Sequence, residues 1–408
     1  MVRPIRVLSL YEGFFAGGAR ILHSDVLVGL HGHEQDHRVL SLTSEARRDG
    51  SIQRIEDDTR YRLLTAAGVH VDALDRTAGA TPLGRADFTE AELVRAARIL
   101  AEVDVIVSLK EQPLSLLLAL NDRGWMPRVP VIVCLHRSDP THSGPAVGWL
   151  VEAIDAGIVS STVSCAESTR AAYEAAGARP RRQEVIANGI DTGRFVPGTA
   201  RQRRRTRKRL EIPRDASVIV FAARFDAMKD PGLFLRAVAA HSATNADTTY
   251  VLCGAGMSWG NDAFRDLVDA SGVPGMARLL PLGIRDDMPR IFQIADIVAL
   301  TSAFGEASPL CLIEGAACGA TPVTTDVGDA ARSVEGIGAV TTHDAAQIAA
   351  TWDTVLSQRP SLRRAALSAR PRLGRERMIY RYRAAIGTLA SRHLAGRRDA
   401  EPAGESAP

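Results

Sequence analysis

The sequence predicts an α/β protein with parallel β-sheets. Short runs of β-branched and other apolar residues alternate with helical stretches along most of the chain, and strands that alternate with helices form parallel sheets. The length of 408 residues is more than a single hydrophobic core usually supports. We therefore expect two α/β domains.

The expected strands fall into two series. The first comprises residues 5–10, 39–42, 103–109, 129–136 and 157–165, and the second comprises residues 218–225, 250–254, 279–283, 297–302 and 321–327. The segment between the two series is rich in Gly, Pro and basic residues, so we place the domain boundary there. The predicted domains are residues 1–197 and 198–375.

The chain ends in a predicted helix and a polar tail. Met378, Tyr382, Ile386 and Leu389 recur at helical spacing, which predicts a helix at 376–394 with one apolar face to bury. Residues 395–408 are polar and rich in Pro, Gly and Ala, and this composition predicts disorder.

A basic run follows the domain boundary. Seven of the nine residues Arg201–Arg209 are basic, and at 100° per residue they surround a helix without leaving an apolar stripe. We interpret this run as a solvated linker helix. Contact with an anionic membrane surface is the second interpretation.

Composition excludes several classes of protein. With 50 Lys and Arg against 47 Asp and Glu, the net charge is only +3, which disfavours a nucleic acid as the main partner. The five cysteines show no C-x-x-C pattern and no apolar run is long enough for a transmembrane segment. We find no secretory leader and expect a cytoplasmic protein with reduced cysteines.

The segment from Phe304 to Gly319 carries two carboxylates around a predicted helix. Ser308 is a good N-cap, Pro309 a good first helical residue and Gly319 a good helix end. Glu306 then lies in the loop before the helix and Glu314 lies inside it, a separation that suits two ends of a hydroxylated ligand.

The helix start after residues 297–302 offers free N–H groups to an anion. The alternatives are that Glu306 is a solvated loop residue and that Glu314 pairs with an Arg.

Arg224 lies at the carboxyl end of the predicted strand 218–225, and Lys229 lies in the loop that follows it. Ligands of open α/β sheets bind at the carboxyl ends of the strands, and a guanidinium fork with an ammonium suits a diphosphate. The alternative is pairing with Asp226 or Asp230. The chain contains no D-x-D triplet and no convincing metal-ligand spacing, so we expect no metal. We assign Gly254, in the Gly254-Ala255-Gly256 turn, to the pocket wall.

Two candidates lie in the first half of the chain. Gly17 and Gly18 end the loop after residues 5–10 and allow the backbone to approach a ligand, although an ordinary turn explains them equally well. His136 follows residues 129–135, and Asp139 is available to orient its ring.

Three motifs together resemble the retaining nucleotide-sugar glycosyltransferases of family 4. They are Arg224 with Lys229, the Glu306-x₇-Glu314 segment with its continuation to Gly328, and residues 185–197 with Asn188-Gly189-Ile190-Asp191. The resemblance covers most of the chain and is strongest from about 184 to 330. Departures from the family pattern are Ala223 for the usual Gly, Ala307-Ser308 for Gly-Phe, and Thr321 for a Pro.

The resemblance implies a GT-B fold, in which two Rossmann-like domains face each other across a cleft. The domain 1–197 would bind the acceptor, the domain 198–375 would bind the donor, and the helix 376–394 would return to the first domain. Glu306 would contact the donor sugar, Glu314 the ribose, and Arg224 and Lys229 the diphosphate. His136 would lie beside the transferred sugar, and the donor pocket would extend over Ser308, Pro309, Leu310, Gly254, Gly17 and Gly18.

These expectations describe a metal-independent, retaining glycosyltransferase that uses an NDP-sugar, with UDP-sugar as the first choice, and a hydroxyl acceptor of unknown class. It would serve glycan, polysaccharide, glycolipid or natural-product biosynthesis. The rivals are a silent sugar-nucleotide-binding scaffold and a GT-B epimerase or phosphorylase.

Overall fold

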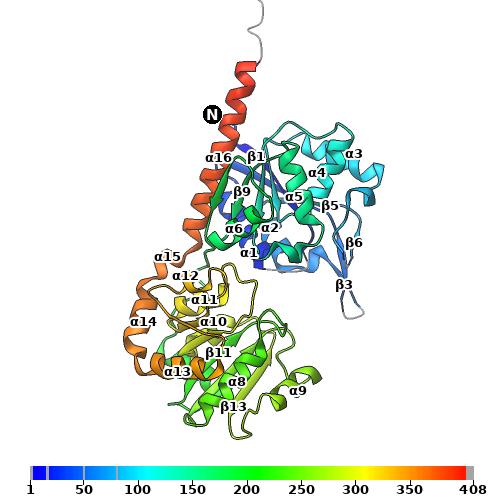
Figure 1. The fold of residues 1–408 in the computed structure, drawn as a ribbon. Helices are drawn as coiled ribbons and strands as arrows, with labels where there is room; N and C mark the ends of the chain where they lie inside the picture. The colour runs from blue at the N-terminus through cyan, green and yellow to red at the C-terminus, as the bar shows by residue number, and fades with distance from the viewer. Residues whose placement is uncertain (1–2, 15–17, 49–50, 80, 401–408) are drawn as a thin grey trace, which may run out of the picture. The chain divides into compact units, whose positions relative to one another are not determined.

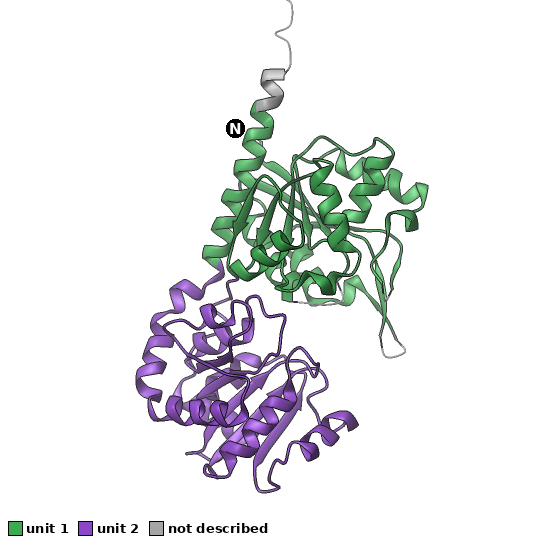
Figure 2. Ribbon diagram, in the orientation of Figure 1, with its two compact units in different colours: residues 1–187, 376–408 green, residues 188–375 purple. Residues whose placement is uncertain are grey.

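The computed structural model of the chain describes residues 3–14, 18–48, 51–79 and 81–400 (Figure 1). The chain divides into two compact units, residues 1–187 with 376–408 and residues 188–375 (Figure 2). Each unit has its own parallel sheet and its own hydrophobic core. The fold class predicted from the sequence is therefore confirmed.

Unit 1 is built on a seven-stranded parallel sheet with the order β10-β9-β8-β7-β1-β2-β5, beside a small sheet with the order β4-β3-β6. Its strands are β1 (Ile5–Tyr11), β2 (Gln35–Ser41), β3 (Glu45–Arg48), β4 (Ser51–Arg54), β5 (His70–Ala73), β6 (Thr77–Ala78), β7 (Val105–Leu109), β8 (Val131–Leu135), β9 (Val159–Ser164) and β10 (Gln183–Val185). Its helices are α1 (Gly18–Leu30), α2 (Thr59–Ala66), α3 (Glu90–Leu100), α4 (Leu114–Asp122), α5 (Ala146–Asp155), α6 (Glu167–Ala175) and α16 (Arg375–Ala400).

Unit 2 is built on a six-stranded parallel sheet with the order β13-β12-β11-β14-β15-β16. Its strands are β11 (Ser217–Ala222), β12 (Thr248–Cys253), β13 (Arg278–Gly283), β14 (Ile297–Leu300), β15 (Thr321–Thr325) and β16 (Ala339–Thr341). Its helices are α7 (Ala200–Arg209), α8 (Pro231–Ser242), α9 (Asp262–Ala270), α10 (Met288–Ile294), α11 (Leu310–Cys318), α12 (Ala330–Ser333), α13 (Ala345–Ser357), α14 (Arg359–Ser368) and α15 (Arg370–Leu373).

The order of the strands fixes where a ligand can bind. In the second unit β11 lies between β12 and β14, and the chain order reverses between β11 and β14. Such a switch point opens a crevice at the carboxyl ends of the strands. The loops after β11 and β14 therefore meet at one edge of the sheet.

The boundary between the units lies ten residues before the predicted position. Ile190 and Phe195 are buried in the core of unit 2, and the Ile190 N–H donates to Leu373 O at 2.9 Å. These contacts assign residues 188–197 to unit 2.

Helix α16 extends further than the predicted helix 376–394. It continues to Ala400, so residues 395–400 are helical and the expected disorder there is wrong. The rest of the predicted tail, 401–408, lies outside the described residues. Met378, Tyr382 and Ile386 are buried, and the Gln35 side chain donates to Arg383 O at 3.2 Å, so this helix belongs to unit 1.

The basic run forms helix α7, but it is not solvated throughout. Arg207 is buried, and its guanidinium group donates to the carbonyl oxygens of Pro213, Arg214 and Ala216 at 2.7–3.2 Å. This residue therefore holds the turn that leads into β11.

Candidate functional site

The loop after β11 carries Arg224 and Lys229, but the two side chains have different surroundings. Arg224 is exposed and pairs with Asp226 at 3.0 Å, which is the alternative that the sequence left open. Lys229 is mostly buried and forms an ion pair with Glu306. The backbone N–H of Lys229 also donates to Asp226 Oδ1 at 3.1 Å, so Asp226 contacts both Arg224 and Lys229.

Glu306 is a buried acceptor and not a solvated loop residue. Its side chain is 4% exposed, and Oε1 accepts hydrogen bonds from Lys229 Nζ and from Ser302 Oγ. Ser302 lies in the loop that follows β14, so the ion pair joins the two loops at the switch point of the sheet. A lysine ammonium has three N–H donors, and the pair with Glu306 leaves donors for an anion.

Helix α11 starts directly beyond this pair. Pro309 is its N-cap residue and Leu310 its first residue, one position later than predicted, because the Pro309 backbone is extended. Within the described ranges no side chain caps this helix end, while Asn188 Nδ2 donates to Ser308 O at 3.3 Å. The first N–H groups of a helix have no partner within it and favour an anion.

Glu314 lies on α11, and its carboxylate has no hydrogen bond to any residue of the described ranges. Burial raises its pKa to about 7, which Arg194 partly opposes. Glu314 forms no ion pair with an Arg among the described residues, so the alternative of an Arg partner is not seen. Burial raises the pKa of the Cys311 thiol to about 12, and the charges of Lys229, Glu306 and Glu314 also act on it.

Gly254 allows two loops to approach each other closely. Its φ is +141°, and a Cβ atom there would lie 2.0 Å from Ala223 O. The Gly254 N–H donates to Gly283 O at 2.8 Å. Ala223, which stands where the family pattern has a Gly, is buried and directly follows β11.

His136 follows β8 in unit 1. Its Nε2 atom is buried and has no hydrogen-bond partner among the described residues. Burial lowers the pKa of His136 to about 4, and Lys110 contributes to this shift. The expected orientation by Asp139 is wrong, since Asp139 accepts from Thr141 at 3.0 Å and pairs with His142 at 3.0 Å.

Of the two glycines in the predicted Gly-rich loop, Gly18 lies within the described residues. Gly18 is the first residue of α1 and is exposed, whereas Gly17 lies outside the described residues.

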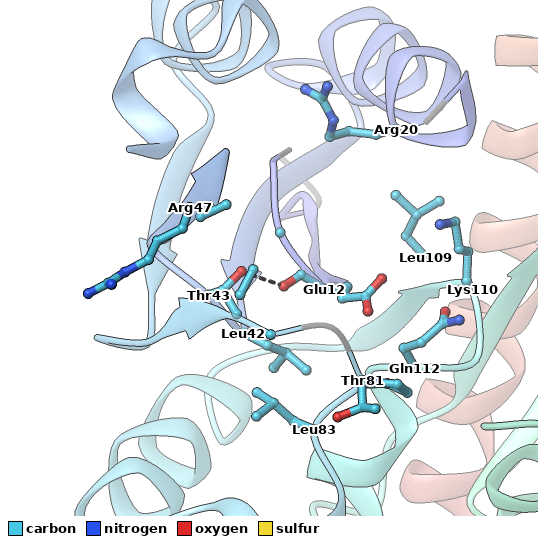
Figure 3. A pocket seen from close by; sticks show the side chains of 15 residues that line it. Glu12, Arg20, Leu42, Thr43, Arg47, Thr81, Leu83, Leu109, Lys110 and Gln112 are labelled. Carbon is cyan, nitrogen blue, oxygen red and sulfur yellow. Dashed lines mark hydrogen bonds between the residues drawn. The ribbon is translucent and has the colours of Figure 1, made fainter. Parts of the chain in front are cut away.

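A pocket of about 270 Å³ opens in unit 1 beside the end of β7 (Figure 3). Its wall includes Glu12, Thr43, Lys110 and Gln112, and the Thr43 hydroxyl donates to Glu12 O at 2.8 Å. None of the predicted motifs includes this pocket. The signal that could have revealed it is Lys110, which is one of three lysines in the sequence and directly follows a buried strand.

The structure brings several of the predicted site residues together. Lys229, Glu306 and the start of α11 lie at one edge of the unit 2 sheet, and Glu314 lies within α11. In unit 1, Lys110 lies within electrostatic reach of His136.

The described ranges lack two features, a cluster of metal-ligating side chains and a membrane-spanning helix. They contain no group of three or more His, Cys, Asp or Glu side chains arranged to hold a metal ion. Within the same ranges, every helix is too short or too polar to cross a bilayer.

Two family models match the chain. "Glycosyl transferase 4-like domain" matches residues 17–189, and "Glycosyl transferases group 1" matches residues 202–372. Curated relatives include a D-inositol 3-phosphate glycosyltransferase of Salinispora tropica, 34% identical over 161 residues, which are 37% of this chain and 33% of the relative. The enzyme of the same name from Mycobacterium sp. (strain KMS) is 33% identical over 198 residues, 47% of this chain and 43% of the relative. The chain thus aligns with less than half of these relatives' length.

Solved structures of low sequence identity share the fold. The Anabaena protein HepE in complex with UDP has a TM-score of 0.75 at 18% identity and covers 94% of this chain and 100% of its own. Sucrose-phosphate synthase from Thermosynechococcus elongatus has a TM-score of 0.71 at 15% identity, covering 97% of this chain and 100% of its own. Both family models describe glycosyltransferases and together match most of the chain, and the chain accordingly belongs to the glycosyltransferases of family 4, with a GT-B fold.

Proposed function

We propose that the protein transfers a sugar from a nucleoside diphosphate sugar to an acceptor hydroxyl with retention at the anomeric carbon. The observation that carries this proposal is the Lys229–Glu306–Ser302 cluster in front of the start of α11. It combines a cation for phosphate with a carboxylate for sugar hydroxyls at the switch point of a parallel sheet.

In the proposed reaction the bond between the anomeric carbon and the diphosphate oxygen breaks. The acceptor oxygen forms the new bond to that carbon, and its proton passes to the diphosphate. Lys229 and Arg224 would stabilise the charge that develops on the leaving diphosphate. The backbone N–H groups of Ser308 and Leu310 at the start of α11 would support the same charge, whereas Pro309 between them has no N–H to donate.

The two carboxylates would read hydroxyl groups of the donor. Glu306 would accept from the donor sugar, and Glu314, which has no partner among the described residues, would accept from the ribose. Gly254 would form the pocket wall. His136 would lie beside the transferred sugar as a neutral imidazole, since its pKa lies near 4, and Gly17 and Gly18 would let the backbone approach the donor.

We propose UDP-sugar as the donor, because the Anabaena relative in fold has been solved with UDP and with UDP-glucose. We further propose that no metal is needed, since Lys229, Arg224 and a helix start offset the diphosphate charge. We also propose a cytoplasmic reaction in glycan, polysaccharide, glycolipid or natural-product biosynthesis, because the five cysteines show no C-x-x-C pattern.

Thermal unfolding with a panel of UDP, GDP, dTDP and their sugars, in EDTA, tests this proposal. Ligands that bind the native state raise the unfolding temperature, and we expect UDP and UDP-sugars to do so in wild type and much less in Lys229→Met. If no nucleotide raises the unfolding temperature of folded protein, the donor proposal is wrong. Product analysis with and without an acceptor separates transfer from epimerisation or phosphorolysis, and release of free sugar without transfer would contradict the proposed reaction.

A further inference from the structure

Lys110 adopts an unusual backbone conformation at the end of β7. Its φ is +69°, one of three positive values among the non-glycine residues of the described ranges. Two hydrogen bonds hold it there, from the Lys110 N–H to Cys134 O at 2.9 Å and from the Ser108 hydroxyl to Lys110 O at 2.8 Å. Glycine adopts this conformation without steric cost, so the fold itself does not call for a lysine at this position.

The Lys110 side chain lines the pocket of unit 1 (Figure 3). Its ammonium group has no hydrogen bond or ion pair within the part of the chain that the structure describes. Burial lowers the pKa of Lys110, although the nearby Glu12 charge opposes this shift. A poorly solvated cation without a partner is unfavourable, so position 110 combines backbone strain with an electrostatic cost. Such costs concentrate at functional sites.

The charges around the pocket favour an anion. Three cations line it, Arg20, Arg47 and Lys110, against the single carboxylate of Glu12. Arg20 is paired with Asp58, and the guanidinium group of Arg47 points away from Lys110 in Figure 3. Of these three cations, Lys110 is therefore the one that lines the pocket without an ion pair in the described residues and does not point away from it, although Arg20 Nε also has no hydrogen-bond partner there.

Other groups of the pocket suit hydroxyls and a small carbon skeleton. Gln112 is 6% exposed, and its Oε1 atom is buried without a hydrogen-bond partner among the described residues. A buried amide oxygen needs a donor, and a ligand hydroxyl would supply one. Leu42, Leu83 and Leu109 form an apolar side of the pocket. The volume of about 270 Å³ admits a ligand of about monosaccharide size.

We propose that this pocket holds the acceptor, and that the acceptor is a small sugar or polyol carrying a phosphate or carboxylate group whose charge Lys110 neutralises. This inference rests on the proposed glycosyl transfer, for which the pocket would supply the acceptor. The anionic group has two sources, a free phosphorylated metabolite or the headgroup of a phospholipid, and both present the same chemistry to Lys110.

Binding of matched probes to the full chain tests the inference. Calorimetry, with and without UDP, would compare glucose 6-phosphate with glucose, inositol 1-phosphate with inositol, and glucuronate with glucose. Phosphatidylcholine vesicles with and without phosphatidylinositol form the lipid arm. We expect at least one anionic member to bind at least ten-fold more tightly than its neutral partner. Tighter binding of a soluble anionic probe would identify a free metabolite as the source of the anion, and tighter binding of the vesicles with phosphatidylinositol would identify a phospholipid headgroup.

The variant Lys110→Gly separates a binding role from a structural one. Glycine accepts the positive φ, so we expect the ligand-free variant to unfold at the wild-type temperature or above while losing the ten-fold preference. The matched control is Glu211→Gly, which relieves a φ of +56° at an exposed position of unit 2 and should keep the preference. The UDP-induced rise in unfolding temperature should persist in both variants.

Three outcomes would overturn the inference. The first is equal binding of anionic and neutral probes, and the second is a Lys110→Gly variant that keeps the preference or unfolds below wild type. The third is protein that binds UDP but none of the anionic probes, soluble or lipid-borne. If UDP itself does not bind, the donor proposal is contradicted instead. The titrations of the pocket without UDP do not depend on the donor proposal and still test the inference.

Discussion

The ammonium group of Lys229 is paired with the carboxylate of Glu306, although 77 residues separate them in the sequence. Their side chains are only 16% and 4% exposed. The pair forms because β11 and β14 are neighbours in the sheet, which brings the loops that follow them together. A cation and an acceptor are thereby held at the edge where parallel sheets bind ligands.

Breaking this pair from one side should be costly. Lys229→Met leaves the buried Glu306 carboxylate without its cation, and we expect it to lower the free energy of unfolding by about 3 kcal/mol. In the double variant Lys229→Met/Glu306→Gln neither charge of this pair remains. Its loss in the free energy of unfolding should therefore be smaller than the sum of the two single losses by about 1–3 kcal/mol. Urea denaturation of all four proteins measures the coupling.

The exposed pair Arg224–Asp226 provides the control. Its side chains are 69% and 31% exposed, and a surface pair contributes less than about 1 kcal/mol. The cycle with Arg224→Met and Asp226→Asn should therefore show little coupling. Equal coupling in the two cycles would contradict the special position of Lys229 and Glu306.

Glu314 should make the stability of the protein depend on pH. Burial raises its pKa from 4.5 in the unfolded chain to about 7 in the folded protein, so the folded state binds the proton more tightly. The stabilisation is complete below pH 4.5 and is lost as the pH rises through 7. Glu314→Gln should thus raise the free energy of unfolding at pH 8, by up to about 3 kcal/mol, and change it little at pH 4.5.

Urea denaturation at both pH values checks this prediction. Glu335→Gln removes an exposed carboxylate of the same unit and should change neither value. The Glu314→Gln variant should also bind UDP more weakly, because a neutral amide accepts less strongly from the ribose hydroxyls than a carboxylate. A variant that is less stable at pH 8 than wild type would show that Glu314 has a stabilising partner in the folded protein.

The sequence predicted the central strands well, because their apolar residues are nearly continuous. The predicted range 218–225 includes all of β11 except its first residue, Ser217, and the predicted range 297–302 contains β14. Both strands are buried throughout or nearly so. The strand prediction was wrong where a strand contains buried polar residues. Strand β2 begins at Gln35, four residues before the predicted start. Its polar residues Gln35 and His37 are buried inside unit 1, where Gln35 Oε1 and His37 Nε2 lie 3.0 Å apart.

Short edge strands were also missed. Strands β10 and β16 have three residues each, which is too few for a periodic pattern. Only their neighbours in the sheet define them, and sequence periodicity contains no information on such pairing.

At the site, the sequence placed Arg224, Lys229 and Glu306 after the strands that carry them. It did not indicate which groups pair, because Glu306 could have faced solvent or Lys229 could have joined Asp230. Lys110 was missed for a different reason. No motif contains it, and its importance arises from a positive φ and a pocket wall formed by residues from 12 to 112.

Gly254 should not tolerate a side chain. In Gly254→Ala the new Cβ atom would lie 2.0 Å from Ala223 O, on a backbone with φ of +141°. We expect a loss of about 3 kcal/mol in the free energy of unfolding and weaker UDP binding, because Arg224 directly follows Ala223. Gly275→Ala is the control, since a Cβ there meets no atom within 4 Å and the φ is not positive. If Gly254→Ala leaves the free energy of unfolding unchanged, the loops after β11 and β12 lie further apart than this contact implies.

Tyr382 should anchor helix α16 to unit 1. Its ring is 5% exposed, lies edge-on to His23 with 6.2 Å between ring centroids, and its hydroxyl donates to Cys134 Sγ at 3.7 Å. Tyr382→Ala removes a buried aromatic ring, so we expect a loss of about 3–4 kcal/mol in the free energy of unfolding. Tyr382→Phe should cost less than about 1 kcal/mol, because a sulfur atom is a weak acceptor.

Tyr380 lies two residues away on the same helix and is 69% exposed, so Tyr380→Ala should stay within about 0.5 kcal/mol of wild type. Urea denaturation measures the three variants, and amide hydrogen exchange shows whether α16 detaches first. Two residues along a helix correspond to a rotation of 200°, so the two tyrosines report opposite faces. A large loss in Tyr380→Ala with a small one in Tyr382→Ala would mean that α16 packs on unit 1 through the other face, and that the contacts with His23 and Cys134 do not form.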